Sequence, residues 1–211
     1  KNGNNSYSNG QTVKNLATGG TVTLTAQWTA NTYYIAFAGN NNTGGSTATK
    51  TCTYDQNCVL TSNGFSRTGY TFNGWKNGNN SYSNGQTVKN LATSGTITLT
   101  AQWKANTYTV TLNRNNGSGG TASVTATYGS AMPAITKPTR TGYTFNGYCT
   151  ATSGGTQYYN ANGASVRNWD KTSATTLYAQ WTVNQYTVTF YDEDGTTVLQ
   201  TGEDAYGTTP A

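Results

Sequence analysis

Side chains that could perform chemistry are scarce in this chain of 211 residues. The sequence has no histidine, which excludes a Ser-His-Asp triad, a Cys-His pair and a histidine-based zinc site. Its three cysteines are too few for a four-thiolate metal site. Paired carboxylates that cleave glycosides would have to come from seven acidic residues, and only Asp55 and Asp170 precede residue 185. We therefore predict that the chain is not an enzyme and holds neither a metal ion nor a cofactor.

Three further patterns resemble binding or cross-linking sites. The glycine pairs at 44–45 and 119–120 lack the Lys-Ser/Thr that completes a phosphate-binding loop, so we interpret them as turns. The acidic run at 192–195 lacks the spaced ligands and the distal glutamate of a calcium loop, which favours a hairpin tip. A Lys-Asn isopeptide bond needs a buried carboxylate nearby, and the acid-poor sequence disfavours one.

Charge is unevenly distributed along the chain. Residues 1–184 carry twelve basic and two acidic residues, whereas residues 185–211 carry five acidic residues and no basic one. The basic residues are scattered rather than clustered, so we expect no nucleic-acid binding. No apolar run approaches the length that spans a bilayer, and we expect no direct membrane insertion.

The cysteines support one covalent prediction. Cys52 and Cys58 are separated by five residues, which permits a turn that brings their Cα atoms within the ~4.4 to 6.8 Å of a disulfide. In the next repeat, Ala126 stands at the position of Cys52 and Met132 at the position of Cys58. We interpret the cysteine pair as a covalent bond in place of a packing contact between these two positions. We predict a disulfide between Cys52 and Cys58, with metal binding by the two thiols as the weaker alternative. Cys149 is expected to stay unpaired and buried.

Internal repetition shows which elements would position these side chains. The sequence Arg-Thr-Gly-Tyr-Thr-Phe-Asn-Gly-Trp at 67–75 returns at 140–148 with only its last aromatic changed. A second motif, Leu-(Thr/Tyr)-Ala-Gln-Trp, ends at Trp28, Trp103 and Trp181, which are 75 and 78 residues apart. We divide the chain into complete repeats at 31–105 and 106–183, the C-terminal part of a repeat at 1–30 and the N-terminal part of another at 184–211. The chain is then expected to be part of a larger protein.

Aromatic residues recur at fixed places within these repeats. Rings that return at the same strand positions are typical of a core, so we predict a repeat core formed by Tyr70, Phe72, Trp75, Trp103, Tyr143, Phe145 and Trp181. The alternative is that exposed rings stack on sugars, with the asparagine-rich loops at 40–42 and 77–80 binding hydroxyl groups. The repeats would then form an array of carbohydrate-binding modules.

Each repeat has the same predicted order of elements. Alternating residues predict a hairpin at 108–128, and residues 33–54 and 186–206 repeat this pattern. In the second repeat, prolines hold 131–139 extended as a crossover. An alternating strand at 96–103 ends the first repeat. Residues 86–92 are predicted to form a short helical turn whose apolar side chains face the sheet. The counterpart at 164–170 aligns Val166 with Val88 and Trp169 with Leu91, and the same apolar pair is expected to face the sheet there. The fold class is therefore α+β, mostly β.

Short connections join the repeats. Only four residues separate Trp103 from Tyr108, where the next alternating strand begins. A flexible linker would be longer and rich in Gly and Ser, so neighbouring repeats are expected to restrain one another. We predict small modules arranged end to end as an elongated rod, with the neighbouring repeats of the same chain as their first partners.

These two motifs and the opening strand Tyr-Thr-Val-Thr at 108–111, in fixed order, closely resemble the internalin B-repeat, also called the Listeria-Bacteroides repeat, over essentially the whole chain. The resemblance implies β-grasp-like modules in tandem within large surface or secreted bacterial proteins. It implies an extracellular, cell-surface or cell-wall location and a non-catalytic role as a structural stalk or adhesin. Partners would be host or bacterial surface glycans or proteins. Tyr148 replaces the expected tryptophan, and Cys52 and Cys58 are additions to the pattern.

Overall fold

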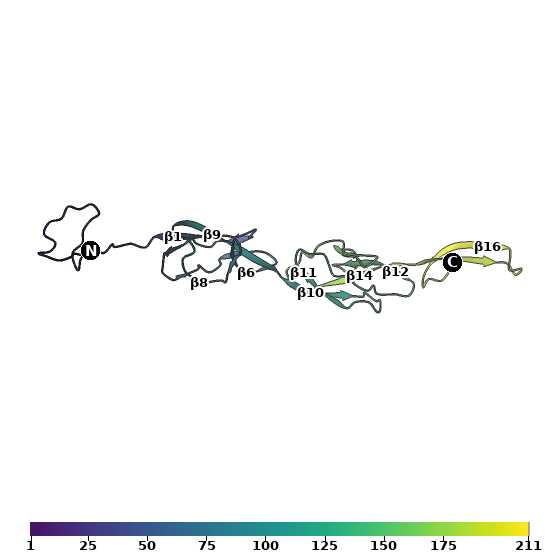
Figure 1. Cartoon of the computed structure of the whole chain (residues 1–211). Helices are drawn as coiled ribbons and strands as arrows, with labels where there is room; N and C mark the ends of the chain where they lie inside the picture. Colours follow the sequence, from purple (N-terminus) through teal and green to yellow (C-terminus); the bar gives the residue numbers. More distant parts are fainter. Residues whose placement is uncertain (211) are drawn as a thin grey trace. The chain divides into compact units, whose positions relative to one another are not determined.

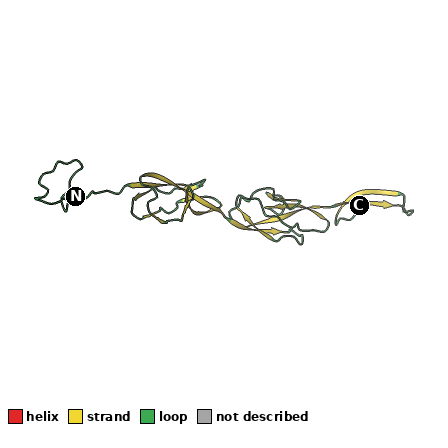
Figure 2. Cartoon of the chain, in the orientation of Figure 1, coloured by secondary structure: helices red, strands yellow, loops and turns green. Residues whose placement is uncertain are grey.

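The computed structural model describes residues 1–210, which contain β-strands and turns and no helix (Figure 2). The predicted α+β class is therefore wrong, and the fold is all-β. No helix of the described residues is long and apolar enough to cross a membrane. The chain is traced from its N-terminus to its C-terminus in Figure 1.

The chain divides into two compact units that do not coincide with the repeats. The first unit combines Lys1–Ala38, Thr47–Asn63 and Trp75–Thr100. The second combines Gly39–Ser46, Gly64–Gly74 and the chain from Ala101 onward.

Each complete repeat contains one five-stranded sheet. The first sheet has the order β3 (Lys50–Thr53), β1 (Thr32–Ala38), β9 (Gly95–Ala105), β6 (Tyr70–Asn77) and β7 (Asn80–Tyr82). The second has the corresponding order β11 (Ser123–Thr127), β10 (Thr107–Asn113), β14 (Thr175–Val183), β12 (Tyr143–Cys149) and β13 (Gln157–Asn160). In both sheets the first strand pairs antiparallel with its hairpin partner and parallel with the strand that ends the repeat.

Three two-stranded sheets complete the structure. They pair β2 (Gly44–Gly45) with β5 (Phe65–Ser66), β4 (Cys58–Val59) with β8 (Thr87–Val88), and β15 (Gln185–Tyr191) with β16 (Val198–Ala205). The three predicted hairpins are confirmed, because β1 pairs with β3, β10 with β11 and β15 with β16, each antiparallel.

Alternation along the strands places one face of each sheet in a core. In β1, Tyr33 and Ile35 are fully buried while Tyr34 between them is exposed, as the period of two requires. The second repeat has one cluster of buried apolar side chains: Val110, Leu112, Ala126, Met132, Phe145, Tyr148, Tyr158, Tyr159, Trp169, Leu177 and Ala179.

A bulge explains the Phe-Asn-Gly-aromatic part of the repeated motif. The pairing of β12 with β14 shifts register between Phe145 and Gly147. Gly147 has φ +129°, and a Cβ at this position would lie 2.0 Å from the carbonyl oxygen of Tyr159, so no larger residue fits. The extra residue places Phe145 and Tyr148, three positions apart, in the same core.

The predicted helical turn at residues 86–92 does not form. Thr87 and Val88 instead pair with Val59 and Cys58 in a two-stranded sheet. Asn90 has φ 55°, which interrupts any right-handed helix. So short a segment gains little from helix formation alone, and the available strand partner satisfies its backbone instead.

The counterpart of this segment, residues 164–170, is also not helical. Ser165, Asn168 and Trp169 each form an isolated β-bridge to another segment. Trp169 is buried as expected, but Val166 is 48% exposed, so the predicted pair of apolar side chains facing the sheet is wrong in this repeat.

Candidate functional site

No cluster in the described part of the chain resembles a reaction centre. Among residues 1–210, no group of three or more His, Cys, Asp or Glu side chains lies close enough to hold a metal ion. The acidic run at 192–195 is a turn, in which Asp194 accepts bonds from the amides of Thr196 and Thr197. The Thr197 hydroxyl also donates to Asp194 and is the largest cause of a lowered pKa. Together with the two amide bonds it lowers the pKa of Asp194 to about 2. The candidate site is instead the contact that joins successive repeats.

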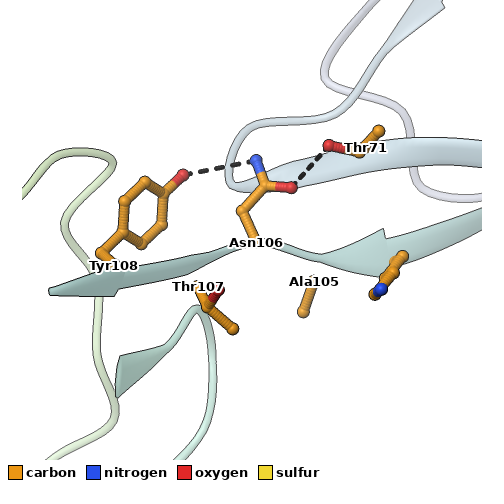
Figure 3. A pocket seen from close by; sticks show the side chains of 6 residues that line it. Thr71, Ala105, Asn106, Thr107 and Tyr108 are labelled. Atoms are coloured by element: carbon orange, nitrogen blue, oxygen red, sulfur yellow. Dashed lines mark hydrogen bonds between the residues drawn. The ribbon is translucent and has the colours of Figure 1, made fainter. Parts of the chain in front are cut away.

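Asn106 forms the centre of the first joint. Its amide N–H donates to the carbonyl of Gly69 at 2.9 Å, and its own carbonyl accepts from the Tyr128 amide at 2.9 Å. Its side-chain oxygen accepts from the Thr71 hydroxyl at 2.6 Å, and its side-chain nitrogen donates to the Tyr108 hydroxyl at 3.4 Å (Figure 3). All four polar groups of this residue are therefore used in one place.

The second joint repeats this arrangement around Asn184. Its amide donates to Gly142 at 2.8 Å, and its carbonyl accepts from the Tyr206 amide at 2.9 Å. Its side-chain oxygen accepts from the Thr144 hydroxyl at 2.7 Å, and its side-chain nitrogen donates to the Tyr186 hydroxyl at 3.5 Å. The same four contacts form although the sequences beyond the joint differ.

A tyrosine ring covers a glycine at each joint. A Cβ on Gly69 would lie 2.3 Å from ring atoms of Tyr128, and a Cβ on Gly142 would lie 2.0 Å from the ring of Tyr206. Both glycines also have positive φ, +77° and +74°, which other residues rarely adopt. The Arg-Thr-Gly-Tyr motif therefore supplies the surface on which the next repeat rests.

Further rings and cations extend the contact. Tyr70 lies edge-on to Tyr128 with centroids 5.7 Å apart, and Tyr143 lies edge-on to Tyr206 at 6.3 Å. The guanidinium carbon of Arg67 stands 4.0 Å above the Tyr70 ring, and that of Arg140 stands 3.6 Å above the Tyr143 ring. This arrangement can hold two segments together but offers no reactive group.

The predicted core residues divide into two sets. Trp75 and Phe145 are buried, whereas the other five are half-buried: Tyr70, Phe72, Trp103, Tyr143 and Trp181. Of these five, Tyr70 and Tyr143 belong to the joints.

Trp103 and Trp181 share one anchoring contact. Their indole N–H groups donate to the carbonyls of Gly39 at 2.9 Å and Arg114 at 3.0 Å. Each indole also meets the phenylalanine of its own repeat edge-on, at 5.6 Å for Phe72 and 5.5 Å for Phe145.

The cysteines lie in the first repeat and in the core of the second. Cys52 on β3 and Cys58 on β4 are joined as a disulfide with their Cα atoms 5.7 Å apart. Their counterparts Ala126 and Met132 are buried in the second repeat. Cys149 is buried with a free thiol, and burial raises its pKa.

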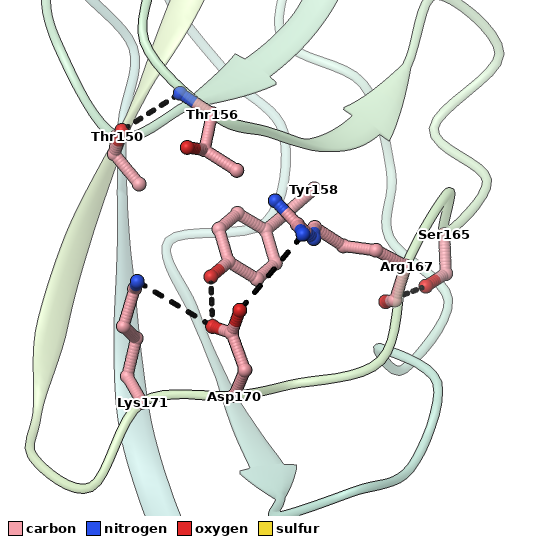
Figure 4. A network of polar contacts seen from close by, with 7 residues as sticks. All are labelled: Thr150, Thr156, Tyr158, Ser165, Arg167, Asp170 and Lys171. Atoms are coloured by element: carbon pink, nitrogen blue, oxygen red, sulfur yellow. Dashed lines mark hydrogen bonds and ion pairs between the residues drawn. The ribbon is translucent and has the colours of Figure 1, made fainter.

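Sequence reasoning missed a polar network in the second repeat (Figure 4). The buried Tyr158 hydroxyl donates to Asp170, which also forms ion pairs with Arg167 at 3.9 Å and Lys171 at 3.5 Å. The pKa of Asp170 is lowered, mainly by the hydrogen bond from Tyr158. The pKa of Tyr158 is raised, mainly by burial. Burial also raises the pKa of Tyr159 to about 12.

Repetition could not reveal this network, because the first repeat uses different residues. There Asp55 accepts from the Asn90 side chain at 2.8 Å and pairs with Lys89 at 3.7 Å. The joint, in contrast, had a signal that was available: the asparagine of each Asn-(Thr/Gln)-Tyr sequence and the glycine of each Arg-Thr-Gly-Tyr sequence recur together.

The repeated sheets and joints define a class, an array of small β-repeats in which each repeat presents a contact surface to the next. Residues 33–102 and 108–180 each match the Listeria-Bacteroides repeat domain. The chain therefore belongs to the Listeria-Bacteroides repeat family, as its motifs indicate.

Three relatives contain a similar stretch. The chain is 28% identical over 193 residues to a "Putative membrane protein" of Evansella cellulosilytica, covering 89% of this chain and 26% of the relative. It is 36% identical over 153 residues to a "Putative Gly-rich membrane protein" of the same organism, covering 68% and 17%. It is 34% identical over 116 residues to Internalin H of Listeria monocytogenes, covering 55% and 20%. The chain thus spans about a quarter or less of the length of these relatives.

Proposed function

We propose that this chain is a non-catalytic, extracellular stalk segment of a bacterial surface protein, in which the joints hold successive repeats in a fixed arrangement. The observation that carries the proposal is the recurrence of one contact around Asn106 and again around Asn184. A freely jointed array has no need of two matching sets of backbone bonds, side-chain bonds and covered glycines.

The order of strands supports a β-grasp-like description of each module, because the first and last strands lie parallel at the centre of a mixed sheet. Its crossover differs from that of a helix-bearing module, since short strands and turns stand in the place of a helix.

Two observations support a location outside the cell. The disulfide between Cys52 and Cys58 is a bond that persists in oxidising compartments. Two relatives carry names that describe membrane proteins, and a third is an internalin. An export signal and a surface anchor in the full-length gene would support this location, and the lack of any export signal would count against it.

Backbone relaxation measured by NMR tests the joint directly. We expect the sheets of residues 31–105 and 106–183 to report one common rotational diffusion tensor. Replacing Asn106 by Ala removes the bonds to Thr71 and Tyr108, and we expect the two sheets to tumble more independently. Asn79→Ala is the control, because Asn79 is an exposed turn residue distant in sequence from Asn106 and is not among the residues with positive φ. Independent tumbling in the unaltered chain would contradict a fixed joint.

An adhesive role is the second candidate. Most of the recurring rings pack within a repeat or at a joint, which leaves few of them for a ligand. One groove in the second repeat is an exception.

A further inference from the structure

The second repeat has an open groove of about 440 Å³ beside β14, the strand that ends this repeat. It is lined by Thr136, Lys137, Pro138, Thr139, Arg140, Tyr143, Phe145 and Trp181. The lining combines a half-buried indole, two cationic side chains and two exposed threonines. None of these residues belongs to a catalytic cluster, and two of them, Arg140 and Tyr143, also contribute to the second joint.

Trp181 forms a rigid wall of this groove. Its indole N–H is bonded to the Arg114 carbonyl, and the ring meets Phe145 edge-on. The ring also lies against Gly117, where an added Cβ would come within 2.6 Å of it. The indole is therefore held in position before any ligand arrives, which limits the entropy lost on binding.

Within the described part of the chain, no carboxylate forms an ion pair with the cations of the groove. The ion pairs found among residues 1–210 involve Lys89, Arg167 and Lys171, and neither Lys137 nor Arg140. Arg140 is ordered by its stacking on Tyr143, and Lys137 is exposed. An anionic ligand matches this charge.

The backbone along the groove is already occupied. Thr139 exchanges both of its backbone hydrogen bonds with Ser118. The Thr136 carbonyl accepts from the Thr121 amide, and the Thr136 amide donates to the Thr121 hydroxyl. Pro138 has no N–H. A peptide strand would find few free backbone groups at Thr136, Pro138 and Thr139, which favours recognition by side chains.

We propose that this groove binds an acidic polysaccharide. A pyranose ring lies against the fixed Trp181 indole, which offers a flat apolar surface. The acidic group of the sugar, a carboxylate or an ester of phosphate or sulfate, is bound by Lys137 and Arg140. The hydroxyls of Thr136 and Thr139 face sugar hydroxyls along the rim.

The first repeat carries a weaker version of this groove. It retains Arg67 and Trp103, but Gly64 stands in place of Lys137 and Phe65 in place of Pro138. The Arg67 guanidinium also donates to the Asn40 carbonyl at 3.5 Å. We therefore expect the second repeat to supply most of the binding.

Affinity electrophoresis of the whole chain tests the proposal with three polymers in the gel: polygalacturonate, neutral dextran and poly-L-glutamate. We expect polygalacturonate to retard the chain, and the other two to have little effect at equal concentration. The double variant Lys137→Gln, Arg140→Gln is expected to bind more weakly by about tenfold or more, because it removes both charge-assisted contacts to the acidic group. The control is Lys14→Gln, Lys76→Gln, which makes the same change in net charge at exposed positions outside the groove.

Four outcomes would overturn the proposal. Two of them are that poly-L-glutamate, or dextran, retards the chain as much as polygalacturonate does. The third is that the control variant loses as much affinity for polygalacturonate as the groove variant, and the fourth is that no polymer retards the chain. Because Arg140 also stacks at a joint, the single variant Lys137→Gln is measured as well, and it is expected to lose part of the affinity with unchanged thermal unfolding. Unaltered affinity of Lys137→Gln would also contradict the proposal.

Discussion

At the scale of single residues, Gly69 and Gly142 explain why the Arg-Thr-Gly-Tyr motif requires a glycine. Each glycine adopts a positive φ that favours glycine, and each lies directly beneath the tyrosine ring of the following segment. The motif was interpreted from the sequence as part of a core strand, and its tyrosine does begin a strand. The structure adds that the residues before this strand form a contact surface for the next repeat.

Replacement of Gly69 by Ala should therefore weaken the joint. The new methyl group would clash with Tyr128, and the positive φ adds strain, so we expect a loss of about 1–3 kcal/mol in the free energy of unfolding. Gly78→Ala is the matched control, because Gly78 also has positive φ but no atom within 4 Å of the added Cβ. Denaturant unfolding monitored at both repeats measures the difference. Equal losses in the two variants would show that the Tyr128 contact contributes nothing.

Buried tyrosines in the second repeat predict a loss of stability at alkaline pH. Burial raises the pKa of Tyr148, Tyr158 and Tyr159 above the ordinary value of 10.0, which is the value expected in the unfolded chain. Their contribution is fully present below pH 10 and falls as the pH rises, because the unfolded chain then releases protons that the folded chain retains. The slope approaches about 1.4 kcal/mol per pH unit for each such tyrosine.

Denaturant titrations at a series of alkaline pH values measure this slope. Tyr158→Phe should reduce it by the share of one tyrosine, although the variant also loses the bond to Asp170. In the folded chain these three phenols should not ionise near pH 10 when phenolate absorbance is followed. A normal titration of all tyrosines in a folded chain would contradict the inferred burial.

At the scale of elements, sequence pattern predicted strands better than it predicted the segments between them. Alternation at Tyr33 and Ile35 indicated β1 because a half-buried strand must place every second side chain inward. The prediction of a helical turn at 86–92 was wrong because two apolar residues three positions apart are compatible both with a helix and with an irregular segment that changes direction. The strand β4 supplied a partner that local sequence could not reveal.

The bulge in β12 and the polar network of Asp170 show a second limit. The glycine of Phe-Asn-Gly permits an unusual backbone, but only the pairing of β12 with β14 shows that the register shifts there. Tyr158 and Asp170 are twelve residues apart and have no shared motif, so their contact follows from tertiary structure alone.

The disulfide is an element-scale feature that can be tested by exchange with the second repeat. The variant Cys52→Ala, Cys58→Met copies the apolar pair at 126 and 132 and removes only the covalent bond. We expect a loss of about 2 kcal/mol in the free energy of unfolding, as the chain-entropy model gives for so short a loop. A reductant should destabilise the unaltered chain similarly and leave the variant unaffected. Mass spectrometry of the non-reduced chain should find a peptide linking 52 to 58, and a link to Cys149 would contradict the assignment.

At the scale of the whole molecule, repetition of the joint leads to a prediction about the array. Under the proposed function, two joints with the same bonds, around Asn106 and Asn184, would leave each repeat little freedom relative to its neighbour. We expect small-angle scattering from the whole chain to show an elongated particle whose flexibility is low. The sequence supports the same expectation through its four-residue connection between Trp103 and Tyr108.

A variant with a flexible Gly-Ser segment inserted between Ala105 and Asn106 supplies the contrast. The insertion separates Asn106 from Gly69 and Thr71 while both sheets keep their own strands. The scattering of this variant should indicate a broader distribution of sizes, and the same insertion in the turn at 152–155 should leave the distribution unchanged. A compact particle for the unaltered chain, or identical flexibility in the chain and the joint variant, would show that the recurring contact does not stiffen the array.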